Sequence, residues 1–379
     1  LPNSVAANTA EVAFESSGSV NGSVIRLGGN ETGFHLSQTE LDAIVTSGSV
    51  SFGGDVTALI VVDSVRVVDN AATVSLVASM TASSAIEFVG EASSFATEAS
   101  VNSRGTVTVA AALSSTARLV LVADSDCDGA GEFVVTASGS VGTPAEVVVR
   151  SAGVSWSGVL DASVSAVTFG VCEGVSMGLG GVSGAEAFYL SQADLDALAS
   201  AATARVTFET VSGSVTMYDL EYLANDIEVN ASTVSVVGSM NVAGLSAFVG
   251  ADIVISANVS ASDSVSVQAT SIDVDADVWL TAVGGVVSLD AADIRSASPT
   301  WWLAGDGIVV AGPLEITGAG TWAVDADTDV DGVGSVSFAS SASVSVSSAS
   351  VSRLEITGAG VALPNSVAAN TAEVAFESS

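Results

Sequence analysis

The chain has 379 residues, 49% of them hydrophobic, and its 42 acidic side chains outnumber 8 basic ones, giving a formal net charge of −34. Such a charge repels nucleic-acid phosphates and anionic lipid heads, so we expect no nucleic-acid partner. No stretch approaches the roughly 18–20 unbroken apolar residues that cross a bilayer, so we also expect no membrane insertion.

The chain begins with LPNSVAANTAEVAFESS, and the same 17 residues return unchanged at 363–379. Identity over this length predicts a tandem repeat of 362 residues, with 363–379 as the start of the next identical copy. The expected partners are therefore other copies of the same repeat, end to end in one chain or fibre. The sequence shows no initiator Met, signal peptide or anchor, and we interpret it as an excerpt or a processed product.

An older duplication lies inside the repeat. FHLSQTELDAI at 34–44 matches FYLSQADLDAL at 188–198, and NAATVSLVASM at 70–80 matches NASTVSVVGSM at 230–240. The predicted divisions are a first half (1–150), a second, duplicated half (151–290), a segment completing the repeat (291–362) and the start of the next copy (363–379).

Each copy of the duplicated Leu-Ser-Gln element predicts a short helix. Ser37 and Glu40 have capping-box spacing, and so do Ser191 and Asp194 in the second copy. In this arrangement the serine caps the helix and the acid reaches back to the cap. The expected helices are 37–45 and 191–199, on the outside of a chain that is otherwise rich in β-structure.

The remaining segments alternate apolar and small polar residues with period two, which indicates strands. The alternation is clear at 105–111 and 343–352, and between 265 and 280 its phase slips once, at Thr270–Ser271, where we expect a corner. LEITGAG occurs at 314–320 and again at 354–360, an offset of 40 residues, and the segments at 70–80 and 230–240 have an offset of 160. Both offsets are multiples of 20, which suggests a rung of roughly 20 residues, or about eighteen rungs per repeat. The predicted fold is all-β, a right-handed parallel β-helix (solenoid) with two short helical insertions.

Two acidic runs resemble the start of an EF-hand calcium loop, with Asp at alternate positions before a Gly. The predicted ligands are Asp124, Asp126, Asp128 and Glu132 in the first run, and Asp325, Asp327, Asp329 and Asp331 in the second. Neither run has Glu at the twelfth position, so we predict a looser Ca²⁺ site in each, with a solvated acidic turn as the alternative. No other cofactor is suggested.

Several further residues have structural interpretations. Asp273, Asp275 and Asp277 are expected to form a charged outer face of one strand, Cys127 and Cys172 allow one disulfide, and His35 is interpreted as a packing residue. Trp301 and Trp302 either fill a wide rung or form a platform for stacking sugars.

Four N-x-[ST] sequons, at Asn21, Asn30, Asn230 and Asn258, are candidate glycosylation sites. Asn21 and Asn30 are favoured because Gly-rich turns surround them.

A catalytic site is not predicted. The chain has one His and no Lys, and it lacks GxGxxG and GxxxxGK loops. Carboxylate pairs are abundant only because acids are abundant. We therefore expect no enzyme activity, with a polysaccharide-acting β-helix enzyme as the alternative.

The segment GGNETGFHLSQTELDAIVTSGSVSFGG at 28–54 resembles parts of filamentous-haemagglutinin-like bacterial surface proteins. The resemblance implies a long, secreted, right-handed parallel β-helix that acts in adhesion or as a surface fibre. The chain has no Arg-Gly-Asp tripeptide, so no adhesion receptor is inferred.

These patterns together predict a structural repeat unit of a long extracellular fibre or cell-surface filament. The alternative is an adhesin that binds glycan or protein through its insertions or its Trp-bearing segment. The acidic surface suits a saline setting, and base-composition bias in the gene is the other explanation.

Overall fold

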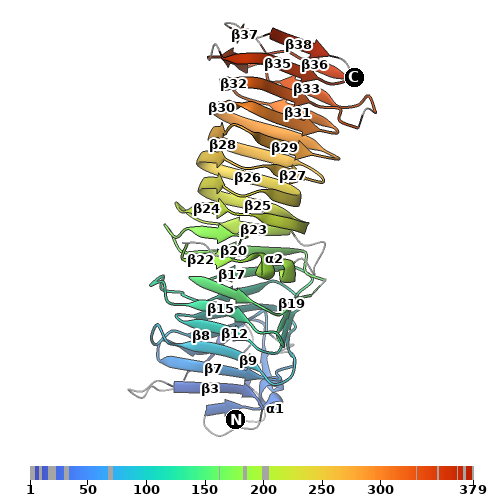
Figure 1. The fold of residues 1–379 in the computed structure, drawn as a ribbon. Helices are drawn as coiled ribbons and strands as arrows, with labels where there is room; N and C mark the ends of the chain where they lie inside the picture. Colours follow the sequence, from blue (N-terminus) through green and yellow to red (C-terminus); the bar gives the residue numbers. More distant parts are fainter. Residues whose placement is uncertain are drawn as a thin grey trace. The chain divides into compact units, whose positions relative to one another are not determined.

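The computed structural model describes residues 5–7, 11–15, 23–29, 34–66, 71–161, 163–181, 186–198, 205–329, 331–347, 350–364, 366–369 and 373–377. The chain is mostly parallel β-sheet, with 62% strand and 4% helix, and winds as a β-solenoid of about 13 turns (Figure 1). This confirms the predicted solenoid with two helical insertions.

Contacts divide the chain into two compact units. Unit 1 comprises Leu1–Val175 with Glu186–Val206, and unit 2 comprises Ser176–Ala185 with Thr207–Ser379. These units are packing divisions, whereas the predicted boundaries at 150, 290 and 362 follow repeated sequence.

Unit 1 has three faces of parallel strands, which the chain visits in rotation. The first face contains β2 (Val12–Phe14), β6 (Ser49–Gly54), β8 (Thr73–Ala78), β11 (Glu98–Ser103), β14 (Leu119–Val122), β17 (Glu146–Arg150) and β20 (Ala166–Gly170). The second contains β4 (Phe34–Leu36), β3 (Ser23–Gly28), β7 (Thr57–Asp63), β9 (Ala85–Val89), β12 (Thr106–Val109), β15 (Glu132–Val135) and β18 (Gly153–Trp156), with β22 (Phe188–Leu190) beside β18. The third contains β10 (Ser93–Phe95), β13 (Ala112–Ser115), β16 (Ser140–Gly142) and β19 (Val159–Leu160), and the pair β1 (Val5–Ala7) and β5 (Ile44–Thr46).

The core of unit 1 is built from columns of aligned inward side chains. Because strands pair in parallel and in register, every second residue stacks on its equivalent in the next rung. One column contains Phe52, Leu76, Val101, Leu121, Val149 and Phe169, all at most 1% exposed. Each such buried side chain contributes about 1.5–3 kcal/mol, so the columns dominate the stability of the unit.

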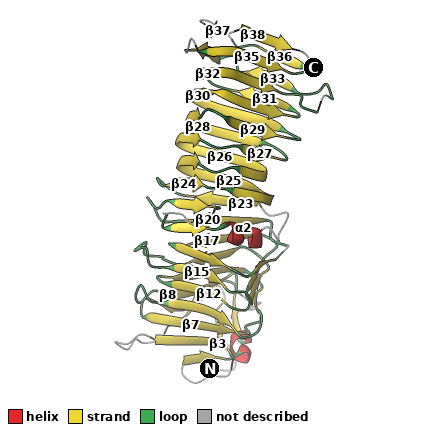
Figure 2. Cartoon of the chain, in the orientation of Figure 1, coloured by secondary structure: helices red, strands yellow, loops and turns green. Residues whose placement is uncertain are grey.

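The two helices are α1 (Gln38–Asp42) and α2 (Gln192–Leu198), drawn red in Figure 2. Both lie within the predicted ranges, which confirms them. Each helix buries leucine against the neighbouring strands: Leu41 in α1, and Leu195 and Leu198 in α2.

Unit 2 has the same three-faced arrangement, but several of its strands continue round corners. The long strands are β25 (Leu220–Val236), β26 (Met240–Ile255), β28 (Val265–Val274), β30 (Val286–Ala304) and β32 (Leu314–Asp325). The shorter ones are β21 (Met177–Leu179), β24 (Ser214–Met217), β27 (Val259–Ala261), β29 (Val278–Ala282), β31 (Gly307–Val310), β33 (Ser335–Phe338), β34 (Ser343–Val346), β35 (Val351–Thr357), β36 (Gly360–Ala362), β37 (Ser366–Ala369) and β38 (Glu373–Glu377). A further strand, β23 (Arg205–Glu209), spans the boundary between the units.

The corner predicted near Thr270–Ser271 is confirmed. In β28, Val265 and Val267 are buried, and the next buried residues are Ile272 and Val274, after the phase has slipped. The predicted charged face is wrong in part. Asp273 lies in β28, but Asp275 and Asp277 follow its end, because Asp277 has a positive φ of 63° and its N–H donates to the carbonyl of Pro299.

The predicted count of about eighteen rungs is wrong, because many rungs carry insertions. Val12 pairs with Val50, and Met177 with Val215, so each of these rungs accommodates a strand and a helix. Leu119 pairs with Val147 across an acidic loop. Leu314 pairs with Val344 across the second acidic loop. Several other rungs are close to the expected 20 residues, as in the pairing of Ala99 with Leu119.

No helix among the described residues is long and apolar enough to cross a membrane.

Candidate functional site

A nine-residue acidic loop occurs twice, once in each unit. The first copy, ADSDCDGAG, covers 123–131, and the second, ADTDVDGVG, covers 326–334. Both follow the end of a strand, β14 in unit 1 and β32 in unit 2. The shared pattern Ala-Asp-x-Asp-x-Asp-Gly-x-Gly aligns Asp124 with Asp327, so the sequence already contained the correct alignment of the two runs.

In both copies the first Asp is buried and organises the loop. Asp124 is 3% exposed, and its Oδ1 accepts hydrogen bonds from the N–H groups of Asp128 (2.9 Å) and Gly129 (3.2 Å). In the second copy the Oδ1 of Asp327, 2% exposed, accepts the equivalent bonds from Asp331 (3.1 Å) and Gly332 (3.3 Å). The two loops thus wrap round one carboxylate in the same way.

Glycine closes each loop. A Cβ at Gly131 would lie 2.0 Å from the backbone nitrogen of Asp124, and one at Gly334 would lie 1.5 Å from the carbonyl oxygen of Ala326. The last Gly of the motif is therefore required by the close return of the chain to its own start.

Three carboxylates converge in each loop. In Asp124, Asp126 and Asp128, and again in Asp327, Asp329 and Asp331, one oxygen from each residue lies within 4.8 Å of the others. Clustered hard oxygens of this kind suit Ca²⁺ chemically. The other two predicted ligands lie outside these triplets: Glu132 begins strand β15, and Asp325 ends β32 and accepts the N–H of Asp327.

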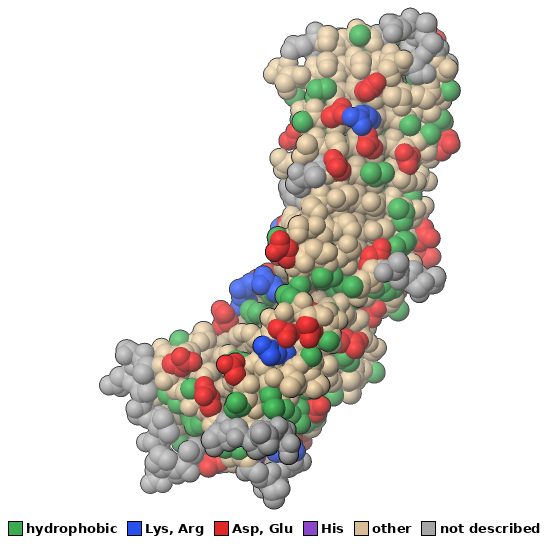
Figure 3. Space-filling view, turned by 90° about the vertical axis from the view of Figure 1, so that its left-hand side faces the viewer, with side chains coloured by type: hydrophobic (Ala, Val, Ile, Leu, Met, Phe, Trp, Pro, Cys, Tyr) green, Lys and Arg blue, Asp and Glu red, His purple; other side chains and the backbone are tan. Residues whose placement is uncertain are grey.

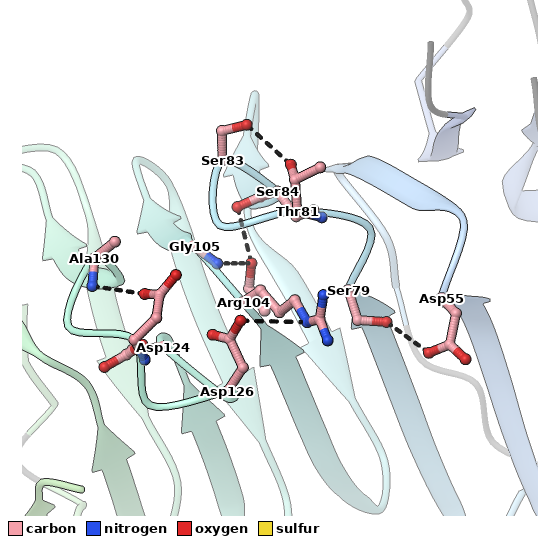
Figure 4. A network of polar contacts seen from close by, with 12 residues as sticks. Asp55, Ser79, Thr81, Ser83, Ser84, Arg104, Gly105, Asp124, Asp126 and Ala130 are labelled. Carbon is pink, nitrogen blue, oxygen red and sulfur yellow. Dashed lines mark hydrogen bonds and ion pairs between the residues drawn. The ribbon is translucent and has the colours of Figure 1, made fainter. Parts of the chain in front are cut away.

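The first loop is held by two additional contacts. Asp126 forms an ion pair with Arg104 at 3.5 Å, which Figure 4 shows beside the polar turn containing Thr81, Ser83 and Ser84. Cys127 forms a disulfide with Cys172, with 5.7 Å between their Cα atoms. The disulfide that the sequence allowed is therefore confirmed, and it connects the loop to the segment that follows β20.

Burial raises the pKa of Asp124 above its usual value. Hydrogen bonds from Gly129 and Asp128 oppose this effect, and the nearby charge of Asp128 adds to it. Desolvation outweighs the hydrogen bonds, so the charged form of Asp124 is disfavoured relative to a carboxylate in water.

Aromatic side chains form two different clusters in unit 2. Trp302 is fully buried and meets Trp322 edge-on with 4.9 Å between ring centroids, whereas Trp301 faces outward and stacks on Trp279 at 4.8 Å and 24°. Trp279 is 42% exposed. Trp302 thus fills the rung as one sequence alternative expected, whereas Trp301 points to the opposite side, because neighbouring residues of a strand alternate. The position of Trp279 beside Trp301 was not predicted, because it depends on the register between rungs.

The predicted sequons differ in accessibility. Asn21 and Asn30 lie outside the described residues. Asn230 is half-buried in β25, where its Nδ2 donates to Glu228 (3.3 Å). Asn258 is exposed and its Oδ1 accepts the backbone N–H of Trp279 (2.9 Å).

His35 contributes to the packing of the β3–β4 pair. Its Nε2 lies 2.5 Å from the carbonyl oxygen of Gly28 in a partly buried hydrogen bond. This agrees with the structural interpretation of the residue.

Comparison with known proteins gives no match, either to a protein-family model or to a curated protein or a solved structure.

Proposed function

We propose that this chain is a structural repeat unit of a long extracellular fibre or cell-surface filament. The observation that carries the proposal is the position of the returning sequence at 363–379. There β37 pairs with β34 and β38 pairs with β35, in parallel and in register. The returning segment therefore packs as an ordinary rung rather than as a linker, which is the arrangement that a continuous fibre would require.

Three properties support an extracellular setting. The disulfide between Cys127 and Cys172 is typical of oxidising compartments. Asn258 presents an exposed sequon. The excess of 42 acidic over 8 basic residues suits a surface immersed in salt or divalent cations.

The acidic surface would keep neighbouring fibres apart. On the face drawn in Figure 3, Asp and Glu side chains are scattered over the surface of each unit rather than gathered in one patch. Several of the few arginines lie beside acids, as in the pair Arg118–Glu146 at 2.9 Å. The proposed mechanism is mechanical: stacked rungs resist bending, and like charge outside prevents lateral aggregation.

Electron microscopy of a two-copy chain, residues 1–362 followed by 1–379, tests this function. A fibre module predicts a straight particle whose contour doubles relative to the single chain. Particles that bend freely at their middle would contradict a continuous fibre.

A second candidate function is adhesion through glycan binding, favoured by the exposed Trp279–Trp301 stack. Aromatic faces with a stacked, rigid geometry bind sugar rings by apolar contact. A glycan array probed with the wild-type chain and with Trp279→Ala would test it, with Val283→Ala as the control because Val283 is 59% exposed outside the stack. Binding that Trp279→Ala abolishes and Val283→Ala keeps supports adhesion, and an array without signal rejects it.

A further inference from the structure

We propose that consecutive copies join through one three-stranded rung, made of the strands at residues 5–7, 12–14 and 34–36. Each of these strands lies between a last strand of the preceding copy and the next strand of its own copy. This inference rests on the proposed function, and it names the contacts of the junction.

The repeated segment pairs through opposite edges in its two occurrences. At the start of the chain, β1 pairs with β5 and β2 pairs with β6, on the side of the following rung. At the end of the chain the same residues form β37 and β38, which pair with β34 and β35 on the side of the preceding rung. Together, the two occurrences show that both edges of these strands can form parallel strand pairs.

The two sets of pairings combine without a change of register. Leu354 pairs with Val374, which is Val12 of the next copy, and Val12 pairs with Val50. Two residues further along each strand, Ile356 pairs with Phe376, the equivalent of Phe14, which pairs with Phe52. Apolar residues thus follow one another in both columns, as they do inside each unit.

Two apolar side chains of the last rung are exposed, although their columns are buried in the preceding rung. Phe376 is 47% exposed and Val367 is 40% exposed, although both stand in inward columns. Ile356, one rung earlier in the column of Phe376, is 2% exposed, and Phe52, which stacks on Phe14 at 5.3 Å, is 1% exposed. A following rung would cover both exposed side chains with the residues that cover their equivalents at the start of the chain.

The internal duplication identifies the third strand of the junction. β4 and β22 are equivalent, since FHLSQTELDAI matches FYLSQADLDAL. β22 lies beside β18, the preceding strand of its face, and its Phe188 is fully buried, 6.3 Å from Phe169. The equivalent Phe34 is 38% exposed, because β4 is paired only on the side of β3 among the described residues. The strand that would take the place of β18 is β36 of the preceding copy.

Charge supports the same contact. Arg353 of β35 lies 3.5 Å from Glu377, which corresponds to Glu15 of the next copy, and 3.6 Å from Glu355. One of only eight basic residues therefore neutralises acids from both sides of the junction.

Thiol labelling of the two-copy chain tests the junction. Phe34→Cys is introduced either in the first copy, which has no preceding neighbour, or in the second, and reaction with a maleimide is followed under oxidising conditions. We expect the second-copy thiol to react at least about tenfold more slowly, because opening of a paired strand must precede reaction. Val283→Cys in either copy is the matched control and should react equally fast in both.

A second measurement does not depend on replacing an apolar side chain. Glu355→Cys in the first copy and Ser51→Cys in the second stand on the outer side of the strands that flank the shared one, two strand spacings or about 9.6 Å apart. A bismaleimide of that span should join them within one chain, whereas Glu355→Cys combined with Ser51→Cys in the first copy should stay unlinked.

Equal labelling rates for the two Phe34→Cys thiols, together with absent cross-linking, would overturn the shared rung. If the same chains are straight under the electron microscope, the fibre function survives that result and only the junction is wrong. Flexible particles combined with equal rates would contradict both.

Discussion

At the scale of single residues, one buried carboxylate defines each acidic loop. Asp124 and Asp327 accept backbone N–H groups from the residues four and five positions later, which folds two more carboxylates toward them. The three negative charges of each loop repel each other, and one of the carboxylates is shielded from solvent. This repulsion is the physical reason for expecting a cation.

Calcium binding stays a prediction, and melting curves can test it. Ca²⁺ should raise the melting temperature relative to EDTA, since it binds the folded loops better than the unfolded chain. Asp126→Asn should reduce the shift, and Asp306→Asn, an exposed acid outside both loops, should leave it unchanged. A melting temperature that is the same in Ca²⁺ and EDTA would reject the site.

The raised pKa of Asp124 predicts a pH dependence of the calcium-free loop. Because the folded pKa lies above the unfolded one, the folded state binds more protons between the two values, and stability increases as pH falls through them. Hydrogen exchange in 124–131, corrected for intrinsic rates, should therefore show tighter closure near pH 4, close to the ordinary aspartate pKa of 3.8, than near pH 7. Asp124→Asn should flatten this dependence, and a loop that opens more readily as pH falls would contradict the account.

At the scale of elements, both helices are capped by a serine and an acid, but the acid of α2 accepts an additional hydrogen bond from a neighbouring strand. Glu40 accepts the N–H of Ser37 (2.9 Å), and these hydrogen bonds lower the pKa of Glu40. Asp194 likewise accepts the N–H of Ser191 (2.9 Å), and its other oxygen accepts the backbone N–H of Trp156 (3.0 Å). The shorter acid thus both caps its helix and fastens it to β18.

This difference predicts unequal costs of cap removal. Ser37→Ala should weaken α1 by about 1 kcal/mol, the usual value for an N-cap. Asp194→Ala should cost α2 more, about 2 kcal/mol, because the N–H of Trp156 loses its partner as well. Native-state hydrogen exchange of each helix gives the local free energies, and equal losses would show that the contact with Trp156 adds nothing.

The disulfide predicts a local gain in stability. Cys127 and Cys172 are 45 residues apart, and disulfides typically stabilise the fold by about 2–4 kcal/mol. The double variant Cys127→Ser, Cys172→Ser should lower the unfolding free energy of the surrounding rungs by that amount in urea. Wild-type chain in reducing buffer should match the variant, and an unchanged urea midpoint in both would contradict a structural role.

Much of the fold was predictable from local patterns. Period-two alternation identified strands, and serine with an acid three residues later identified both helices, since these signals are local. The rung count was not predictable, because insertions such as 123–131 lengthen single turns without disturbing the pattern on either side. The Trp279–Trp301 stack was missed because it depends on which residues of different rungs align, and a sequence does not show that register.

At the scale of the whole molecule, the important feature is the return of residues 1–17 at 363–379. A solenoid rung contacts only its neighbours and leaves apolar side chains bare where the stack stops. Phe34, Val367 and Phe376 are such side chains, exposed here although they occupy inward columns. In the proposed tandem array, β36 of the preceding copy would cover Phe34, and β5 and β6 of the following copy would cover Val367 and Phe376.

Cryo-electron microscopy of the two-copy chain would show whether the rungs continue through the junction. The account predicts parallel strands at about 4.8 Å spacing running without interruption through the junction, with the internal copy of 1–17 contacting a rung on each side. A break in the strand ladder at the junction, with the internal copy of Phe34 and Phe376 still facing solvent, would contradict it.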